Sequence, residues 1–140
     1  MKNKIFIFDL DDTLYKEIDF LYSAYREIAG WIELKFSLKG IYAFMLETYK
    51  EQADVFSRLI DTYDLSLTKA DLLSIYRSHR PNIRLELDTL KALEVLKQDF
   101  ILGMITDGRS ITQRNKFQAL GLEQFIENEN LVISEEFGSE

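Results

Sequence analysis

The sequence predicts an α/β protein with a Rossmann-like parallel sheet and a helical subdomain inserted after the first strand. Two apolar runs, Ile5–Phe8 and Phe100–Ile105, each stop at polar residues, which is typical of buried strands in a parallel sheet. From Tyr15 to about Ser78, between these runs, the sequence has helical periodicity instead. Strands that alternate with helices favour a parallel sheet with right-handed crossovers. One sheet interrupted by a helical insertion is therefore expected.

The first strand is predicted over residues 4–10, and helices follow it. A later helix is expected to begin at Thr68, whose hydroxyl can cap it while Asp71 completes a capping box. Pro81 ends the helical block, because proline disfavours helix in the residue before it. The apolar stripes of these helices are predicted from Phe20, Ala24, Ile28, Trp31, Ile41, Met45, Thr48, Val55, Phe56, Leu59, Leu72, Leu73 and Tyr76.

The sequence after Pro81 predicts a helix, a strand, another helix and another strand. Asp88 is expected to cap the helix before the second strand. Ser110 and Gln113 predict a capping box for the helix after that strand, and Gly121 is expected to close it. Leu131–Ile133 predict a short third strand.

The composition is that of a compact folded protein and argues against several function classes. Of 140 residues, 46% are hydrophobic, and the formal net charge of −7 with no basic block argues against nucleic acid or anionic membranes as partners. A small phosphorylated metabolite remains compatible, because a metal ion and backbone amides neutralise it locally. The lack of cysteine rules out disulfides and thiolate metal sites. No apolar stretch suits a signal peptide or a membrane span, so we expect a soluble, cytoplasmic protein.

Acidic residues follow the first predicted strand directly, in Asp9-Leu10-Asp11-Asp12-Thr13. Open α/β sheets bind ligands at the C-terminal ends of their strands, so the acids are expected at the mouth of a site. Asp9 is a candidate nucleophile, because a carboxylate can attack phosphorus and form an aspartyl-phosphate that water hydrolyses. Asp11 is the candidate general acid and base. The two charges repel, and Mg²⁺ would relieve that repulsion, so the pair predicts a magnesium site at Asp9 and Asp11.

A second polar motif follows the second predicted strand. Thr106 ends that strand, and its hydroxyl is expected to reach the same phosphate from the neighbouring position in the sheet. Asp107 and Gly108 follow at the turn into a helix, where free backbone N–H groups suit an anion. Gly108 allows the backbone to approach closely. These three residues are therefore the candidate phosphate-binding group.

The two motifs resemble those of the haloacid dehalogenase superfamily. Its first motif is an apolar strand followed by Asp-x-Asp-x-Thr, and its second is an apolar strand that ends in Thr or Ser. The resemblance covers essentially the whole chain. It implies a Rossmann-like core at residues 1–14 and 82–140, interrupted by a helical cap at residues 15–81.

The same resemblance implies a Mg²⁺-dependent phosphatase of small phosphate esters. By analogy Asp9 is the nucleophile and a metal ligand, and Asp11 is the acid and base, with its main-chain carbonyl on the metal. Thr106 would then contact the phosphoryl group. An aspartate at position 11 points to phosphatases rather than to dehalogenases, which lack that acid.

The chain also departs from the family pattern. Relatives of this kind continue from a stretch like Ser134–Gly138 into a Lys-Pro motif and then a fourth strand ending in an acidic pair. These 140 residues hold neither, so we expect a core incomplete at its C-terminus, with little or no activity on its own. Lys116 is the nearby lysine, but it lies inside the helix after the second strand, which argues against it as a substitute.

The absent fourth strand has a structural consequence. In the family it pairs with the first strand, so here the first strand is expected to be an exposed apolar edge that invites pairing with another chain. The alternative function is therefore a truncated, non-catalytic module that assembles through this edge, for example as a homo-oligomer.

Other interpretations of the motifs stay open or fail on the residues. Acids after a strand also occur as solvated turn residues or helix caps, and the second motif alone would fit a simple strand-to-helix turn. A calcium loop fails, because Leu14 stands where it needs glycine and Phe20 where it needs its last acid. His79 is expected at the surface or at a helix end rather than facing a substrate.

Overall fold

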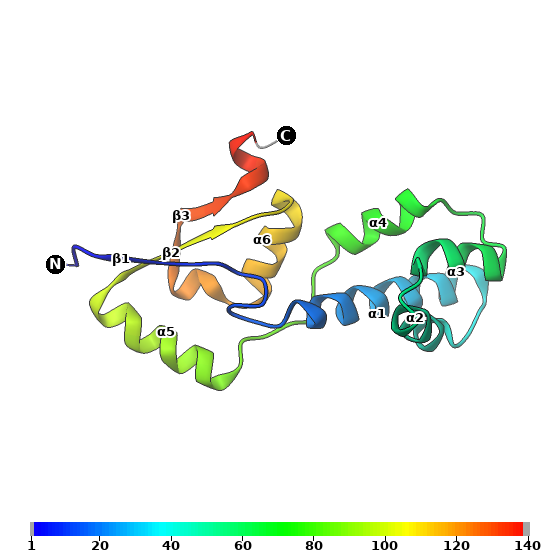
Figure 1. The fold of residues 1–140 in the computed structure, drawn as a ribbon, viewed down its shortest axis with the longest axis horizontal. Coiled ribbons are helices and arrows are strands. Elements are labelled where there is room, and N and C mark those ends of the chain that lie inside the picture. The colour runs from blue at the N-terminus through cyan, green and yellow to red at the C-terminus, as the bar shows by residue number, and fades with distance from the viewer. Residues whose placement is uncertain (1, 139–140) are drawn as a thin grey trace. The chain divides into compact units, whose positions relative to one another are not determined.

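The computed structural model describes residues 2–138. The chain divides into two compact units, an α/β unit of Met1–Phe20 with Arg80–Glu140 and a helical unit of Leu21–His79 (Figure 1). The α/β unit consists of two segments far apart in the sequence, because the chain leaves its sheet after the first strand and returns after the helices.

A three-stranded parallel sheet forms the centre of the α/β unit in the part of the chain that the structure describes. Its strands are β1 (Ile5–Phe8), β2 (Ile101–Thr106) and β3 (Ile126–Ile133), in the order β1-β2-β3. Phe8 pairs with Met104, and Thr106 pairs with Ile133. The predicted α/β class and parallel sheet are confirmed.

The third strand begins at Ile126, five residues before the predicted start at Leu131. Its middle, Glu127–Glu129, is polar and exposed, which hid the strand in the sequence. The pairing with β2 shifts register there, because Leu102 pairs with Ile126 but Met104 pairs with Leu131. The pairing of β3 with β2 is therefore irregular at these residues, and no alternation of apolar residues marks them as a strand.

Two helices flank the strands of the α/β unit, α5 (Leu87–Asp99) before β2 and α6 (Ser110–Ala119) after it (Figure 1). Two short 3-10 helices, η1 (Leu122–Gln124) and η2 (Ser134–Phe137), precede and follow β3. Gly121, with φ +68°, closes α6 as predicted. The core of this unit is made of Leu10, Leu14, Tyr15, Phe20, Ile83, Leu93, Leu102, Met104, Phe117, Leu120, Leu122, Phe125, Ile126, Leu131 and Ile133.

Two predicted helix caps in this unit are wrong. The helix expected to begin after Asp88 has Glu86 as its N-cap, so Asp88 lies in its first turn. Helix α6 has Arg109 as its N-cap and no side-chain cap, and Ser110 is already its first residue. The Gln113 side chain does not complete a capping box, because it contacts other partners described below.

The helical unit is built from α1 (Glu17–Phe36), α2 (Ile41–Lys50), α3 (Val55–Tyr63) and α4 (Lys69–Ser78) (Figure 1). The Thr68–Asp71 capping box at the start of α4 is present as predicted. Trp31 is more exposed than the stripe predicted, at 36%. The buried core of this unit is Tyr25, Ile28, Ala29, Ile32, Ile41, Met45, Val55, Phe56, Leu59, Leu65 and Leu72.

His79 is the C-cap residue of α4, which confirms its place at a helix end, but it is buried rather than on the surface. Its Nδ1 lies 2.8 Å from the carbonyl oxygen of Tyr76, so Nδ1 carries the proton and donates. Its Nε2 lies 3.1 Å from the Ser23 hydroxyl. The histidine therefore joins α1 to the end of α4 within the helical unit.

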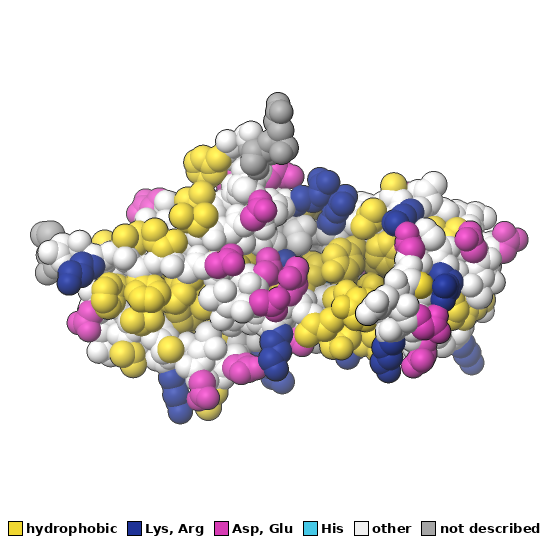
Figure 2. All heavy atoms as spheres, viewed as in Figure 1, with side chains coloured by type: hydrophobic (Ala, Val, Ile, Leu, Met, Phe, Trp, Pro, Cys, Tyr) yellow, Lys and Arg dark blue, Asp and Glu magenta, His cyan; other side chains and the backbone are white. Residues whose placement is uncertain are grey.

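Strand β1 lies at one edge of the described sheet, as predicted. Its residues Ile5, Phe6 and Ile7 are 52%, 40% and 50% exposed. Figure 2 shows hydrophobic side chains gathered over the part of the face where Figure 1 draws β1. None of the helices in residues 2–138 combines the length and the apolar character that crossing a bilayer requires.

Candidate active site

The candidate site is built at the C-terminal edge of β1 and β2. Asp9 follows the last residue of β1, and Thr106 is the last residue of β2. Because the two strands are parallel neighbours, their carboxyl ends meet at the same edge of the sheet. Helix α6 begins three residues after Asp107, at Ser110, so its first turns are part of the same region.

The loop after β1 is fixed by a buried leucine and a tight turn. Leu10 is completely buried, and its carbonyl oxygen accepts the backbone N–H groups of Thr13 (3.2 Å) and Leu14 (3.1 Å). Asp12 adopts a positive φ of 57°, a conformation that aspartate tolerates better than most residues. Its carboxylate accepts the N–H of Glu17, the first residue of α1 (2.9 Å). The loop therefore leads into the helix with Asp11 held against the sheet edge.

Three side chains donate hydrogen bonds to the Asp11 carboxylate. The Tyr15 hydroxyl (2.6 Å) and the Lys116 ammonium (2.8 Å) donate to Oδ1, and the Gln113 amide donates to Oδ2 (3.0 Å). Burial raises the pKa of Asp11, but these hydrogen bonds and the Lys116 charge outweigh it, so the pKa lies below its ordinary value. Asp11 is therefore held ionised and in one orientation.

Gln113 connects the two sequence motifs. Its Nε2 donates one hydrogen to Asp11 and the other to the Thr106 hydroxyl (2.6 Å). Thr106 and Gln113 are both buried, at 2% exposure each. Because Thr106 accepts this bond, its own hydroxyl hydrogen is left to donate, which suits a phosphoryl oxygen.

Gly108 makes room for that connection. A Cβ at this position would lie 3.1 Å from both Cδ and Cγ of Gln113, and the φ of +144° is one that residues with side chains rarely adopt. Both the backbone conformation and the close approach therefore require glycine here.

Lys116 is a buried cation, with 4% exposure. It lies one turn after Gln113 on the same face of α6. Its ammonium pairs with Asp11 on one side, and the Phe20 ring centroid lies 4.5 Å away on the other. The pair and the cation–π contact together replace the water that the ammonium loses on burial.

Asp9 stands apart from this network. Its side chain is exposed, and its Oδ1 accepts the N–H of Leu10 (2.8 Å). Within residues 2–138 no hydrogen bond or ion pair joins it to Thr106, Gln113 or Lys116. The proximity of Asp9 to the Thr106 hydroxyl, and its role as nucleophile, therefore stay predictions.

The turn after β2 is occupied by residues from the end of β3. The Gly108 N–H, predicted to be free for an anion, donates to the Ser134 hydroxyl (2.9 Å). That hydroxyl in turn donates to the Asp107 carboxylate. The N–H of Ser110 donates to the Glu135 carboxylate (3.1 Å). A phosphate at this turn would have to take the place of these oxygens, so the roles of Asp107 and Gly108 also stay predictions.

Residues 2–138 contain no cluster of three or more acidic, histidine or cysteine side chains that could hold a metal ion by itself. The available donors are the exposed carboxylate of Asp9, one oxygen of which has no partner among the described residues, and the main-chain carbonyl of Asp11. Both are hard oxygen ligands, and Mg²⁺ commonly binds one or two carboxylates and completes its shell with water and substrate phosphate. The residues present therefore fit Mg²⁺ in part.

Neither Tyr15 nor Gln113 is predicted as a site residue from the sequence, and the place of Lys116 inside a helix argues against it. One signal was available. The buried positions Gln113, Lys116, Phe117 and Leu120 follow the spacing of an apolar helix stripe, so a glutamine and a lysine stand where apolar residues are expected. Polar residues that a helix buries need partners, and the partners here are the site.

The sheet order, the acids after β1 and the threonine after β2 define an α/β protein with acidic residues at the carboxyl edge of its parallel sheet. The family model of haloacid dehalogenase-like hydrolases matches residues 6–137. The chain belongs to this family of hydrolases.

A curated relative and two solved structures are similar over nearly the whole chain. Over 94% of its length the chain is 29% identical to glyceraldehyde 3-phosphate phosphatase of Methanocaldococcus jannaschii, of which it covers 62%. Its structure is similar to that of the HAD-hydrolase YfnB from Bacillus subtilis, solved with bound magnesium, with 19% sequence identity and a TM-score of 0.62. This match covers 99% of the present chain and 66% of YfnB. The 2-haloacid dehalogenase from Pseudomonas syringae pv. tomato DC3000 has the same coverages, 20% identity and a TM-score of 0.55.

The two structural likenesses show the fold, which is the Rossmann-type core of these hydrolases. The chain spans less than two thirds of the length of each of the three proteins.

Proposed function

We propose that the chain carries the nucleophile and the acid–base group of a Mg²⁺-dependent phosphatase for small phosphate esters. The observation that supports it best is the network at the sheet edge, where Gln113 connects the Asp11 carboxylate to the Thr106 hydroxyl. A second support is the relative named as a phosphatase of glyceraldehyde 3-phosphate, a small phosphate ester. Dehalogenases have no use for an acid at position 11, whereas ester cleavage needs a proton donor for its leaving oxygen.

In the proposed reaction an oxygen of the Asp9 carboxylate attacks phosphorus, a bond to phosphorus forms, and the ester P–O bond breaks. Because the free site holds Asp11 ionised, Asp11 must first take up a proton from solvent as the ester binds. It gives this proton to the departing oxygen, then takes one from the water that attacks the aspartyl-phosphate. Inorganic phosphate leaves and Asp9 is restored. A bound Mg²⁺ would neutralise charge on the phosphoryl oxygens and on Asp9.

The surrounding residues have positioning roles in this proposal. Thr106 donates its hydroxyl hydrogen to a phosphoryl oxygen, and Asp107 and Gly108 offer backbone N–H groups once Ser134 moves away. Lys116 and Gln113 fix the orientation of Asp11. Fixed orientation matters because a proton donor must meet its acceptor within hydrogen-bond reach.

Residues 15–81 are proposed to act as a cap. The supporting observation is that Leu21–His79 form a compact unit with a core of their own. In such a role the helical unit would exclude water from the reaction and contribute to substrate choice.

The proposal is tested by beryllium fluoride binding, which mimics a phosphoryl group on a carboxylate and needs no turnover. With Mg²⁺ present, ¹⁹F NMR should show a bound signal for the chain and for Asp12→Asn, and none for Asp9→Asn. Asp12 is the matched control, because it is an exposed acid of the same loop whose oxygen accepts only a helix N–H.

Turnover is measured alongside with 4-nitrophenyl phosphate and Mg²⁺. Any hydrolysis should disappear in Asp9→Asn and persist in Asp12→Asn. Undiminished beryllium fluoride binding or hydrolysis in Asp9→Asn would contradict the assignment of the nucleophile. If the unaltered chain binds no beryllium fluoride, the proposed site is not functional in these 140 residues.

A further inference from the structure

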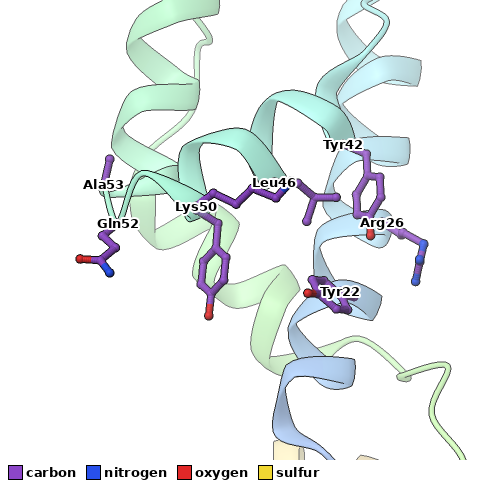
Figure 3. A pocket seen from close by; sticks show the side chains of 8 residues that line it. Tyr22, Arg26, Tyr42, Leu46, Lys50, Gln52 and Ala53 are labelled. Carbon is purple, nitrogen blue, oxygen red and sulfur yellow. The ribbon is translucent and has the colours of Figure 1, made fainter.

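The helical unit contains an open pocket of about 720 Å³, between α1, α2 and the turn that follows α2 (Figure 3). A volume of this size is typical of small-molecule sites. Figure 3 shows Tyr22, Tyr42 and Arg26 at one end, Gln52 and Ala53 at the other, and Leu46 between them. The lining residues are Tyr22, Arg26, Tyr42, Leu46, Tyr49, Lys50, Gln52 and Ala53.

The lining of this pocket is positively charged although the chain carries a net charge of −7. Two of its residues, Arg26 and Lys50, are cations, and none is an acid. Within residues 2–138 Arg26 has no carboxylate partner, and its guanidinium carbon lies 5.0 Å from the centroid of the Tyr42 ring. Lys50 makes only a long pair of 3.5 Å with exposed Glu47. An anion in the pocket would therefore meet two largely uncompensated charges.

The acids of the neighbouring turn are engaged elsewhere. Glu51 pairs with Arg58, and Asp54 pairs with Lys69 while it caps α3. The Lys69 pair and the Ser57 N–H lower the pKa of Asp54, which keeps this carboxylate charged and with its partners. Neither acid neutralises the pocket cations.

The pocket walls are aromatic. Tyr22, Tyr42 and Tyr49 present three rings, and Leu46 adds an aliphatic wall. Among the described residues none of the three hydroxyls makes a hydrogen bond, and neither does the Gln52 amide. Rings with unengaged polar tips can pack on an aromatic ligand and bind its polar substituents at the same time.

The turn that holds Gln52 adopts a conformation that its sequence does not favour. Gln52 has φ +59°, and the N–H groups of Gln52 and Ala53 donate to the carbonyls of Tyr49 (2.9 Å) and Thr48 (3.3 Å). This is the Schellman arrangement, in which glycine is the usual residue at the position of Gln52. A side chain kept at a strained position beside a pocket suggests that the side chain is used there.

We propose that this pocket binds a planar aromatic anion, with its ring against the tyrosines and its carboxylate or phosphate on the guanidinium of Arg26. A guanidinium binds such a group through parallel hydrogen bonds, and stacking on tyrosine favours a flat ring over an aliphatic one. Lys50 and the Gln52 amide add polar contacts from the other end. The proposal concerns the helical unit alone and does not rest on phosphatase activity.

The test is calorimetric titration of the 140-residue chain with 2-naphthoate, in the absence of Mg²⁺. We expect saturable binding at one site, with a dissociation constant below about 1 mM. Cyclohexanecarboxylate keeps the charge without the aromatic ring, and 2-naphthalenemethanol keeps the ring without the charge. Both probes should bind about tenfold more weakly than 2-naphthoate. Ring stacking and a charged hydrogen bond are each expected to change the dissociation constant by about this factor.

Two variants locate the site. Arg26→Met should weaken 2-naphthoate binding about tenfold. Lys35→Met is the matched control, because Lys35 is a cation of the same helix that lies 5.3 Å over the Trp31 ring, outside the pocket. It should leave binding unchanged. Lys50→Met should also weaken binding, and it removes the second charge from a different helix.

Amide shifts in NMR should move at Tyr22, Tyr42 and Gln52. Several results would overturn the proposal: no saturable binding, equal affinity for the three probes, equal loss in Arg26→Met and Lys35→Met, or amide shifts confined to β1. Arg26 is exposed, so its replacement leaves the fold intact, and a far-UV circular dichroism spectrum checks this.

Discussion

Replacing Lys116 by methionine tests whether the buried cation holds Asp11 in place. Methionine keeps the length of the side chain and its contact with Phe20, so the change removes mainly the charge. Breaking a fully buried pair costs about 3–5 kcal/mol. The Asp11 side chain is 22% exposed and keeps two other donors, so the smaller loss of about 2 kcal/mol for a charged hydrogen bond applies.

The assay is urea unfolding followed by circular dichroism, at neutral pH and again near pH 3. The folded-state pKa of Asp11 lies below its ordinary 3.8, so the stability it contributes is present above that value and is lost as the pH falls through the folded-state pKa. The difference in free energy of unfolding between the unaltered chain and Lys116→Met should therefore become smaller at low pH. It should also shrink if Asp11 is first changed to Asn, since the two residues interact directly.

Lys97→Met is the matched control. Lys97 is a lysine of the same unit with its ammonium 5.7 Å over the Phe125 ring, but it is exposed and pairs with a carbonyl rather than a carboxylate. Its replacement should change the free energy of unfolding by less than about 0.5 kcal/mol. Equal effects of the two substitutions, or a Lys116→Met effect that does not vary with pH, would refute the reasoning.

Three further predictions concern other parts of the chain. Gly108→Ala should destabilise the fold by more than the roughly 1 kcal/mol expected of Gly40→Ala in urea unfolding, because both have positive φ but only at Gly108 does the new Cβ meet Gln113. Burial raises the pKa of Tyr25 from 10.0 to about 12, so the stability it contributes is complete below pH 10 and is lost as the pH rises toward 12. Tyr25→Phe should flatten that loss in alkaline unfolding experiments, and an unchanged slope would contradict it. Ile7→Lys should lower any self-association seen by light scattering, because a lysine on an exposed edge strand opposes pairing with another chain.

The sequence predicted the parts of the fold that local pattern determines. The runs before Asp9 and Thr106 are short, apolar and end in polar residues, so β1 and β2 were predicted within a few residues of their bounds. The start of β3 was missed because exposed polar residues and a change of register interrupt it at Glu127–Glu129. Pairing with β2, which no local pattern records, makes that stretch a strand.

The capping box at Ser110 failed for a related reason. Ser-x-x-Gln is a common start of a helix, and it predicts that the glutamine turns back to the cap. In the structure Gln113 finds acceptors at Asp11 and Thr106 instead, both brought to it by the sheet. A local preference worth about 1 kcal/mol gives way to two hydrogen bonds in a buried place, one of them to a charged group.

Lys116 shows how such a residue can be found from sequence. A lysine inside a helix is most often solvated, which is why its place in the chain argued against a role. Its position around the helix axis favours a buried role, because Lys116 lies with Gln113, Phe117 and Leu120 on the face that α6 buries. A buried ammonium needs an opposite charge, and the acid it finds is Asp11, more than 100 residues earlier in the chain. In a protein with acids at a sheet edge, a charged residue on the buried stripe of the next helix is therefore a candidate partner of those acids.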